Sequence, residues 1–508
     1  MMTFASQGTN YYFALPQRNI NIIHDALLNV SNIEHEQYGE YWTKESILQT
    51  IAPSYEFQSK VMNCLDNIGF TDIHTFGDAI RASHSQDVQL KVRDVCGEYY
   101  EVMERVKPNN NKRKNKPMSV DEGYAGKEVT DRLYGLSGKN VSGVSVGVIE
   151  FQDNGGVLLD DLATYQMLNG ESTNNPKKLI RNHDEDTESS LDIQMISQTA
   201  PGADLWYWNN ENWLYGFAVD FFHATEKPDV ISMSWGWSET DQCSIVDCGN
   251  STSAEYVNRT NVEFMKIALQ GVTIVASSGD SGAPGRTNEY CDMTHPVNPV
   301  LPGGSPWVTS VGGTYLLSTN DDSATKTTPL CENYPCANGT VERVTSFKEV
   351  GWTAGGGFSS TKYMPFQKNA IQTYLSRVQQ LPPLFHRHGR AYPDVSMIAH
   401  NCPTVEFGSV SPVDGTSCSS PLFAGLVAVL NYHQVQNGKP KLGYLNPLLY
   451  KMGEQNVFHD IAVGNNQCTE SGCCNSSFGF MATKGFDPVT GWGTPNVQKM
   501  LAFLDAHT

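Results

Sequence analysis

Five short apolar segments, separated by helix-like stretches, constrain most strongly what this chain can fold into. They read VSVGVIEF (144–151), ADLWYWN (203–209), DVISMSWG (229–236), VTIVASSG (272–279) and WVTSVGGT (307–314). Between them lie SSLDIQMISQTA and SAEYVNRTNVEFMKIALQG, which have helical periodicity. Short β-rich runs separated by helices predict an α/β fold with a doubly wound, mainly parallel sheet covered on both faces. Sites on such sheets gather at the carboxyl ends of strands.

The N-terminal part of the chain has a different pattern. NINIIHDALLNVSN and EFQSKVMNCLDNIGF show helical periods, and DVQLKV is β-rich, so residues 1–106 predict a small α+β domain. KPNNNKRKNKP follows at residues 107–117; it is charged, rich in asparagine and without an apolar face. It predicts an exposed linker over residues 107–125 that a protease can cut.

Composition narrows the class of protein and of partner. A chain of 508 residues with 39% hydrophobic content can bury a large core in more than one domain. A net charge of -19 and a pI of about 5.1 argue against a nucleic-acid partner, and suit a protein that works in acid, where self-repulsion fades. The sequence contains no uncharged apolar run of about 18 or more residues, so it predicts no membrane span.

Cysteines and glycosylation sequons point to an oxidising compartment. Several of the 12 cysteines are closely spaced, in QCSIVDC, CENYPC and CTESGCC, without a histidine at zinc-ligand spacing, so short disulfide loops are expected. Asn-X-Ser/Thr sequons occur at Asn29, Asn140, Asn250, Asn258, Asn338 and Asn475. The opening residues show no signal peptide. A missing upstream leader would explain this conflict, and so would a cytosolic or viral origin.

Two motifs carry polar groups at the places where the sheet predicts a site. VASSGDSGAPG puts Asp280 directly after an apolar strand, in a glycine-rich turn. DGTSCSSP puts Ser417 before the apolar run LFAGLVAVLNYH, where a helix start can stabilise an oxyanion. An ordinary capped helix would explain this serine equally well.

A serine nucleophile needs a base, and carboxylates supply the best candidates. None of the 13 histidines has a setting typical of a subtilisin-type triad; His388 lies in HGR, within a loop-like stretch. In TESSLDIQMI, Glu188 and Asp192 are four residues apart and project from one face of the expected helix. A solvated acidic stretch is the alternative, since HDED precedes the pair.

In order and separation, ESSLD, SSGDSGA and DGTSCSSP resemble the catalytic motifs of the sedolisin family of serine-carboxyl peptidases. SPWVTSVGGT, GGGFSS, GRAYPDVSMIA, LGYLNPLLY and GFDPVTGWGTPN are similar to its lysosomal tripeptidyl-peptidase branch. The resemblance implies a subtilisin-like catalytic domain over residues 126–508. Ahead of it would lie an N-terminal prodomain that inhibits the enzyme and assists folding, with the activation cleavage in the linker.

The resemblance also implies a role for each of four residues. Ser417 would attack the peptide carbonyl, Glu188 would accept its proton, Asp192 would orient Glu188, and Asp280 would donate a hydrogen bond to the oxyanion. Elementary acid–base chemistry favours a carboxyl base in acid. At a pH of about 4, a histidine with a pKa of about 6.5 is more than ~99% protonated, whereas a carboxyl with a pKa of about 4.3 is poised to accept a proton.

A calcium site is the second expectation that the resemblance brings. HDIAVGNN and ATKGFDPVTGWG resemble the family's calcium-binding segments, and hard oxygen ligands suit Ca²⁺. The carboxylates would come from Asp460 and Asp487, and the backbone carbonyls from Ile461, Thr483 and Gly485; two ordinary Asp-containing turns are the alternative.

The chain departs from the family pattern at several positions. The family usually has Ser-Gly-Thr-Ser-Ala around the nucleophile, but Asp414 and Cys418 stand here. We expect Asp414 to shift local pKa values, and Cys418 to be either a small buried residue or a disulfide partner. Thr483 and Lys484 replace the usual Gly-Pro of the calcium segment, and the prodomain is shortened at both ends.

The sequence therefore predicts a zymogen of an acid-acting peptidase, in a lysosomal or secreted setting, with peptides and proteins as substrates. Tripeptide release from free N-termini is favoured, and internal cleavage is the alternative. SMSWGW (232–237) is expected to lie along the cleft as an extended substrate partner, although core packing explains it equally well. An inert secreted binding protein would lack at least one of the four residues, and a neutral subtilisin-like enzyme would need a histidine base.

Overall fold

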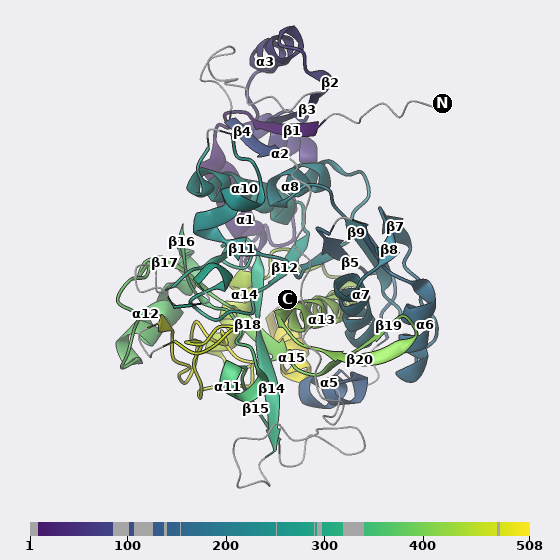
Figure 1. Cartoon of the computed structure of the whole chain (residues 1–508), viewed down its shortest axis with the longest axis vertical. Coiled ribbons are helices and arrows are strands. Elements are labelled where there is room, and N and C mark those ends of the chain that lie inside the picture. Colours follow the sequence, from purple (N-terminus) through teal and green to yellow (C-terminus); the bar gives the residue numbers. More distant parts are fainter. Residues whose placement is uncertain are drawn as a thin grey trace.

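The computed structural model describes residues 9–84, 101–105, 125–136, 140–288, 290–291, 297–318, 340–474 and 478–507, apart from 153 and 250. The N-terminal domain, drawn in purple at the top of Figure 1, is an antiparallel sheet covered by helices. Its strand order is β2 (Thr71–Thr75), β3 (Ala79–His84), β1 (Thr9–Ala14) and β4 (Glu101–Arg105). Its helices are α1 (Ile20–Val30), α2 (Lys44–Ile51) and α3 (Tyr55–Asn67).

Helices α1 and α3 confirm the helical patterns predicted for this domain. Serine and threonine hydroxyls begin the second and third helices: Thr43 accepts a hydrogen bond from the Ser46 N–H, and Ser54 accepts one from the Phe57 N–H. DVQLKV lies outside the described residues, as does almost all of the predicted linker.

The second domain is built on a mainly parallel eight-stranded sheet. Its order is β15 (Thr340–Val344), β14 (Thr309–Ser318), β12 (Thr273–Ser277), β10 (Val230–Met233), β5 (Ser145–Glu150), β9 (Asp204–Asn209) and β7 (Lys178–Ile180), with β18 (Val395–Ile398) also paired to β14. Only the β14–β15 pairing is antiparallel among these described strands. All five predicted strands are present, which confirms the doubly wound α/β sheet.

Helices cover both faces of this sheet (Figure 1). One core cluster joins α5 (Lys127–Tyr134), α6 (Leu159–Leu168), α7 (Thr187–Thr199), α13 (Thr416–Gln436) and α15 (Val497–His507). The cluster on the other face contains α8 (Leu214–His223) and α10 (Ser253–Leu269). Strand β5 contributes side chains to both clusters: Val146 and Val148 belong to the first and Ile149 to the second.

Shorter elements complete the second domain. The helices are α9 (Gln242–Ile245), α11 (Phe347–Val350), α12 (Lys368–Arg377) and α14 (Asn446–Glu454). The strands are β6 (Gly155–Gly156), β8 (Asp184–Glu185), β11 (Trp237–Ser238), β13 (Val300–Leu301), β16 (Gly357–Lys362), β17 (Gly389–Tyr392), β19 (Cys402–Glu406) and β20 (Ser409–Val413). Among the described residues, disulfides join Cys243 to Cys248, Cys468 to Cys473, and Cys291 to Cys474. Two of the closely spaced cysteine pairs therefore form the expected short loops, and the CENYPC pair lies outside the described residues.

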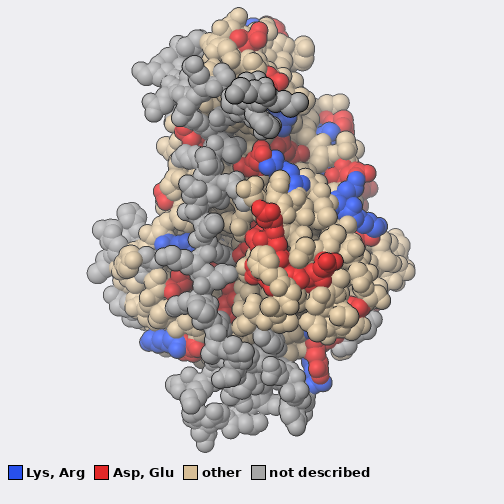
Figure 2. Space-filling model, turned by 45° about the vertical axis from the view of Figure 1, so that its right-hand side comes forward, with Lys and Arg blue, Asp and Glu red and all other residues tan. Residues whose placement is uncertain are grey.

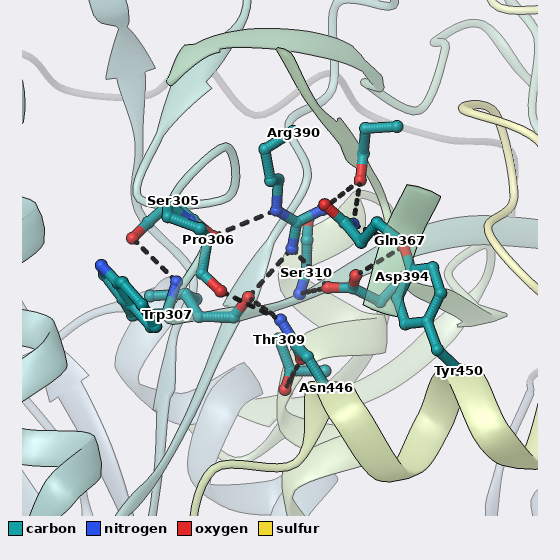
Figure 3. Close-up of polar contacts among 12 residues, drawn as sticks. Ser305, Pro306, Trp307, Thr309, Ser310, Gln367, Arg390, Asp394, Asn446 and Tyr450 are labelled. Carbon is teal, nitrogen blue, oxygen red and sulfur yellow. Dashed lines mark hydrogen bonds and ion pairs between the residues drawn. The ribbon is translucent and has the colours of Figure 1, made fainter. Parts of the chain in front are cut away.

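A fully buried arginine fixes the loop that leads into β14 (Figure 3). Arg390 donates hydrogen bonds to the carbonyl oxygens of Ser305 (3.1 Å) and Val308 (3.0 Å), and forms an ion pair with Asp394. Asp394 in turn accepts a hydrogen bond from the Ser310 N–H at 2.8 Å. These bonds satisfy backbone groups that would otherwise be buried unpaired, so they fix the loop that leads into β14.

The N-terminal domain docks on α8 and α10 through a buried cluster of charges. Asp78 follows β2, and its carboxylate lies 2.7 Å from the Lys266 ammonium; neither side chain is exposed. Glu263 also pairs with Lys266, and Arg259 donates to the backbone oxygens of Leu15 and Asp78, at 2.8 Å each. Each buried charge has an opposite partner, so the loss of one partner would leave the other buried and uncompensated.

Within the described residues, no helix is long and apolar enough to cross a membrane. The face drawn in Figure 2 carries larger red acidic areas than blue basic ones, in keeping with the net charge of -19.

Candidate active site

Ser417 lies in the first turn of α13, as the sequence predicts, and its side chain is almost fully buried. The hydroxyl donates a long hydrogen bond, 3.4 Å, to the Ser234 carbonyl oxygen just past β10. Gly415 caps the helix with a φ of 135°. A Cβ there would lie 3.3 Å from an Asp280 carboxylate oxygen, so both the backbone angle and the close approach favour glycine.

Asp280 stands three residues past the end of β12 and contacts the turn that carries Ser417. Its Oδ1 accepts hydrogen bonds from the Thr416 N–H (2.8 Å) and the Thr416 hydroxyl (2.7 Å). Its Oδ2 lies 3.9 Å from the Arg286 guanidinium. The sequence predicted that Asp280 and Ser417 would lie at the carboxyl edge of the sheet. In the structure Asp280 contacts Thr416, the residue before Ser417.

Glu188 and Asp192 are one turn apart on α7, both buried. The helix begins with a cap in which Asp186 accepts a hydrogen bond from the Ser189 N–H at 3.0 Å. Because both carboxyls are buried, the solvated acidic stretch that was the alternative is wrong. Burying two carboxylates side by side is costly, and the cost falls when one of them is protonated. Carboxyls kept in such a setting are candidates for a functional site.

The helices α7 and α13 pack side by side, and Gly425 of α13 lies against the last turn of α7. A Cβ at Gly425 would lie 2.0 Å from the Thr199 hydroxyl and 3.0 Å from the Ile196 carbonyl oxygen, so only glycine fits at this crossing. Ser417 and Glu188 each precede this crossing by eight residues, roughly two helical turns. Glu188 also helps to raise the pKa of the Cys418 thiol, after burial and the nearby groups Cys402 and Asp414, which places it close to α13 at the residue after Ser417.

A further buried carboxyl, which sequence reasoning missed, lies beside this pair. Glu150 ends β5 and is fully buried; burial raises its pKa, and the charges of Asp192, Asp186 and Glu188 raise it further. The Trp235 indole N–H donates to it at 2.6 Å. The signal was a lone glutamate at the end of the apolar strand VSVGVIEF, at the sheet edge where sites gather.

A pocket adjoins Asp280 on the side of the segment SMSWGW. Ser234, Gly236, Trp237, Arg286 and Val300 are among its lining residues. The segment is not one extended strand, because β10 ends at Met233 and β11 begins at Trp237. The alternation of tryptophans therefore does not follow one strand, although part of the segment borders the pocket.

Both departures around Ser417 are resolved in the structure. Cys418 is a buried free thiol whose sulfur lies 3.4 Å from the Val413 carbonyl oxygen, so it is a small buried residue and not a disulfide partner. Asp414 contacts His400, whose Nδ1 lies 3.0 Å from each carboxylate oxygen. His400 was not among the histidines that the sequence singled out.

The five residues expected to bind calcium lie in one group of loops near the C-terminus. Asp487 is fully buried and accepts hydrogen bonds from the N–H groups of Thr483 (2.7 Å) and Thr490 (2.9 Å), and Asp460 accepts one from the Gly485 N–H (2.9 Å). The carbonyl of Ile461 accepts a hydrogen bond from the Thr490 hydroxyl at 3.4 Å.

Burial raises the pKa of Asp487 to about 8, and the nearby Asp460 raises it too. Two adjacent carboxyls and neighbouring backbone carbonyls form a hard oxygen donor set, which fits a divalent cation such as Ca²⁺. Among the described residues, however, no three His, Cys, Asp or Glu side chains gather at any point to hold a metal. Any cation here would depend on backbone oxygens as much as on carboxylates.

Comparisons with known proteins agree with this architecture. Residues 5–110 match the family model of the pro-kumamolisin activation domain, and residues 180–475 match that of the subtilase family. Physarolisin of Physarum polycephalum is 35% identical, over 97% of this chain and 93% of the relative. Tripeptidyl-peptidase 1 of Mus musculus is 27% identical over 97% and 91%. That of Canis lupus familiaris is 33% identical over 62% of this chain and 51% of its own length.

A solved structure points the same way. The chain is similar to Pseudomonas sedolisin, a serine-carboxyl proteinase solved with two molecules of pseudo-iodotyrostatin, with a TM-score of 0.58 and 25% identity over 76% of this chain and 99% of that one. The activation-domain match, the subtilase match and the full-length relative together cover both domains described above. The chain belongs to the sedolisin family and is a serine peptidase made as a zymogen, with an N-terminal activation domain ahead of a subtilase-like catalytic domain.

Proposed function

We propose that this chain is a serine-carboxyl peptidase that works in acid and releases tripeptides from the free N-termini of peptides and proteins. One observation supports the chemistry above all others. Ser417 lies in the first turn of α13, which packs against α7, the helix that carries the buried carboxyls of Glu188 and Asp192, and Asp280 contacts the turn of Ser417 through Thr416.

Each residue then has one role in the hydrolysis. Ser417 Oγ attacks the substrate carbonyl carbon as its proton passes to Glu188, which Asp192 orients. The oxyanion accepts a hydrogen bond from Asp280, which must be protonated to donate it, a state that acid favours. Glu188 returns the proton to the leaving amine. A water molecule then attacks the acyl-enzyme while Glu188 takes its proton, and Glu188 gives that proton to Ser417 Oγ as the carboxylic acid product leaves.

Tripeptide release is supported by the relatives called tripeptidyl-peptidase 1. The disulfides and the sequons suit a lysosomal or secreted enzyme, and so does the proposed activity in acid. The test is to incubate the acid-treated enzyme at pH 4 with one peptide in two forms, with a free or an acetylated N-terminus, and to identify products by mass spectrometry. Tripeptides from the free form alone support the proposal; equal internal cleavage of both forms would assign an endopeptidase instead.

The prodomain is proposed to act as an intramolecular inhibitor held by the Asp78–Lys266 contact. We expect Asp78→Asn to weaken prodomain binding by about 3 kcal/mol, because Lys266 loses a partner that is as fully buried as itself. Glu56→Gln is the matched control, since Glu56 pairs with Lys60 on the exposed surface of the same domain and its loss should leave prodomain binding unchanged. The measurement is inhibition of the mature enzyme by added prodomain, and equal inhibition constants for both variants would rule out the contact as the anchor.

His223 is expected to make prodomain release acid-dependent. Its ring packs against Phe76 of the prodomain, at 4.9 Å between ring centroids. Burial lowers its pKa to about 3; Lys266, Lys44 and Lys227 lower it too, against an opposing effect of Asp78. The free catalytic domain would therefore bind a proton that the complex cannot. The complex is fully stable above a pH of about 6.5, the ordinary histidine pKa, and weakens as pH falls toward about 3.

His223→Gln removes this proton uptake, so the pH at which half of the zymogen becomes active should fall. The measurement is a series of acid incubations of variant and parent, each followed by an assay at one common pH. An activation midpoint that stays the same or rises would contradict the role of His223.

Calcium binding by Asp460, Asp487 and the carbonyls of Ile461, Thr483 and Gly485 is proposed as a structural device. Bound Ca²⁺ would displace the proton that Asp487 holds when its pKa is about 8, and would bind both carboxylates. We expect a calcium chelator to lower the thermal unfolding temperature at pH 7, with added Ca²⁺ restoring it, and Asp487→Asn to lose that response. Lys484 follows Thr483 but offers only a cationic side chain, so Lys484→Ala should keep the response. An unfolding temperature indifferent to chelation in the parent protein would remove the calcium site.

A further inference from the structure

Asp414 stands three residues before Ser417, at the junction between β20 and α13. This is the position at which the chain departs from the serine that its family usually carries. Its carboxylate accepts a hydrogen bond from the Asn401 N–H at 2.8 Å, and both of its oxygens lie 3.0 Å from His400 Nδ1. The Gly415 N–H donates to the Ala399 carbonyl oxygen at 3.0 Å, so the junction is tied to residues 399–401 by side chain and backbone.

The pair is well shielded from water. The His400 side chain is 7% exposed and that of Asp414 is 13% exposed. The edge of the Tyr315 ring faces His400, with 6.4 Å between ring centroids. The nearby Cys418 thiol is also buried, and its pKa is raised by burial first, then by Cys402 and by the charges of Asp414 and Glu188. Charges in such a setting interact more strongly than they would in water.

The electrostatic consequence follows from the sign of each charge. A carboxylate three residues from the nucleophile adds negative charge where an oxyanion must form, and so opposes catalysis. A protonated His400 cancels that charge while keeping the hydrogen bonds that fix the junction. With His400 protonated the pair is neutral overall, and with a neutral imidazole it carries one negative charge.

We propose that His400 and Asp414 are a positioning pair for the nucleophile: Asp414 holds the junction between β20 and α13, the helix that carries Ser417, and protonated His400 neutralises Asp414. This inference rests on the proposed role of Ser417. It gives the chain a second acid requirement, separate from the protonation states of Glu188 and Asp280. The departure from the family's serine is then compensated by a residue of the neighbouring loop between β18 and β19.

The test is a double-mutant cycle on the acid-activated enzyme, using His400→Gln, Asp414→Asn and the two together. At pH 4 to 5, His400→Gln should lower kcat by about tenfold with little change in KM, because it leaves Asp414 charged and unpaired. Asp414→Asn alone keeps an acceptor for Asn401 and should stay within about threefold of the parent. The double variant should recover to the level of Asp414→Asn, since no charge remains to be neutralised.

The pH profile gives a second readout that a packing role would not move. The pH dependence of kcat should be shallower in Asp414→Asn than in the parent enzyme, because the variant has no carboxylate for a protonated His400 to neutralise. Thermal unfolding of each variant identifies any loss of fold, and Asp414→Ser, the residue usual in the family, replaces Asp414→Asn if the latter is unstable.

Three results would overturn the inference. Equal losses in His400→Gln and the double variant would show a packing role only. Complete loss in His400→Gln without recovery would assign His400 to the proton transfer itself. An active parent enzyme with four indistinguishable profiles would show that the pair does nothing. Failure of the proposed function is a different result, because the parent and Ser417→Ala would then have equal activity.

Discussion

Ser417→Ala is expected to abolish peptide hydrolysis, with kcat at pH 4 falling at least about 10⁴-fold. The hydroxyl is the attacking group, and alanine removes it without adding bulk to the buried first turn of α13. Binding should survive, because the pocket beside Asp280 stays intact. The measurement is the initial rate of a fluorogenic peptide after acid activation, together with the affinity for an uncleaved peptide.

Ser419→Ala is the matched control for this change. Ser419 lies on the same turn and is equally buried, but its hydroxyl donates back to the Thr416 carbonyl oxygen at 3.0 Å. It should retain most of the parent activity. Because the zymogen needs processing, both variants are produced with a cleavable linker so that a loss of self-activation is not mistaken for a loss of catalysis. Parent-like turnover in Ser417→Ala would exclude it as the nucleophile.

Glu188→Gln is the second large effect, expected to lower kcat by about 10² to 10⁴-fold across the pH range. The amide occupies the same space at the start of α7 but cannot accept the serine proton. The loss should appear in kcat more than in KM, since the carboxyl acts on the transition state rather than on bound substrate. Steady-state kinetics at several pH values would measure it.

Asp184→Asn is the control for Glu188→Gln. Asp184 is an exposed carboxyl four residues earlier in the HDED stretch, so its loss changes the net charge equally but leaves the buried pair untouched. Its activity should match that of the parent. Similar losses in the two variants would mean that overall acidity, and not a specific base, explains the effect.

Local sequence patterns were sufficient to predict the architecture of the catalytic domain. Each predicted strand was a short apolar run and each connecting helix had a 3.6-residue period, signals that lie within one element. The strand ends were less well predicted: DVISMSWG continues past Met233 in sequence, although β10 ends there. The backbone turns at that point to border the pocket, a tertiary constraint that residue type does not reveal.

Some residues of the candidate site could be predicted from local motifs, and others could not. Glu188, Asp280 and Ser417 stood in recognisable motifs, so their order along the chain pointed to one site. Glu150 and His400 did not, because their significance comes from partners that the sequence places far away or in an unremarkable loop: Trp235 is 85 residues from Glu150. The Asp78–Lys266 contact, 188 residues apart, was equally invisible. Burial turns ordinary acidic and basic residues into functional ones, and burial is decided by the whole fold.

The pH dependence of kcat/KM for the mature parent enzyme, from pH 2 to 8, tests the central claim most directly, since that claim is that a carboxyl group takes the serine proton. The account predicts activity that is highest in acid, is governed by groups titrating in the carboxyl range, and falls toward neutral pH. Activity that is absent at pH 4, rises through pH 6.5 and reaches a plateau near neutrality would be the signature of an imidazole base, and would contradict the account.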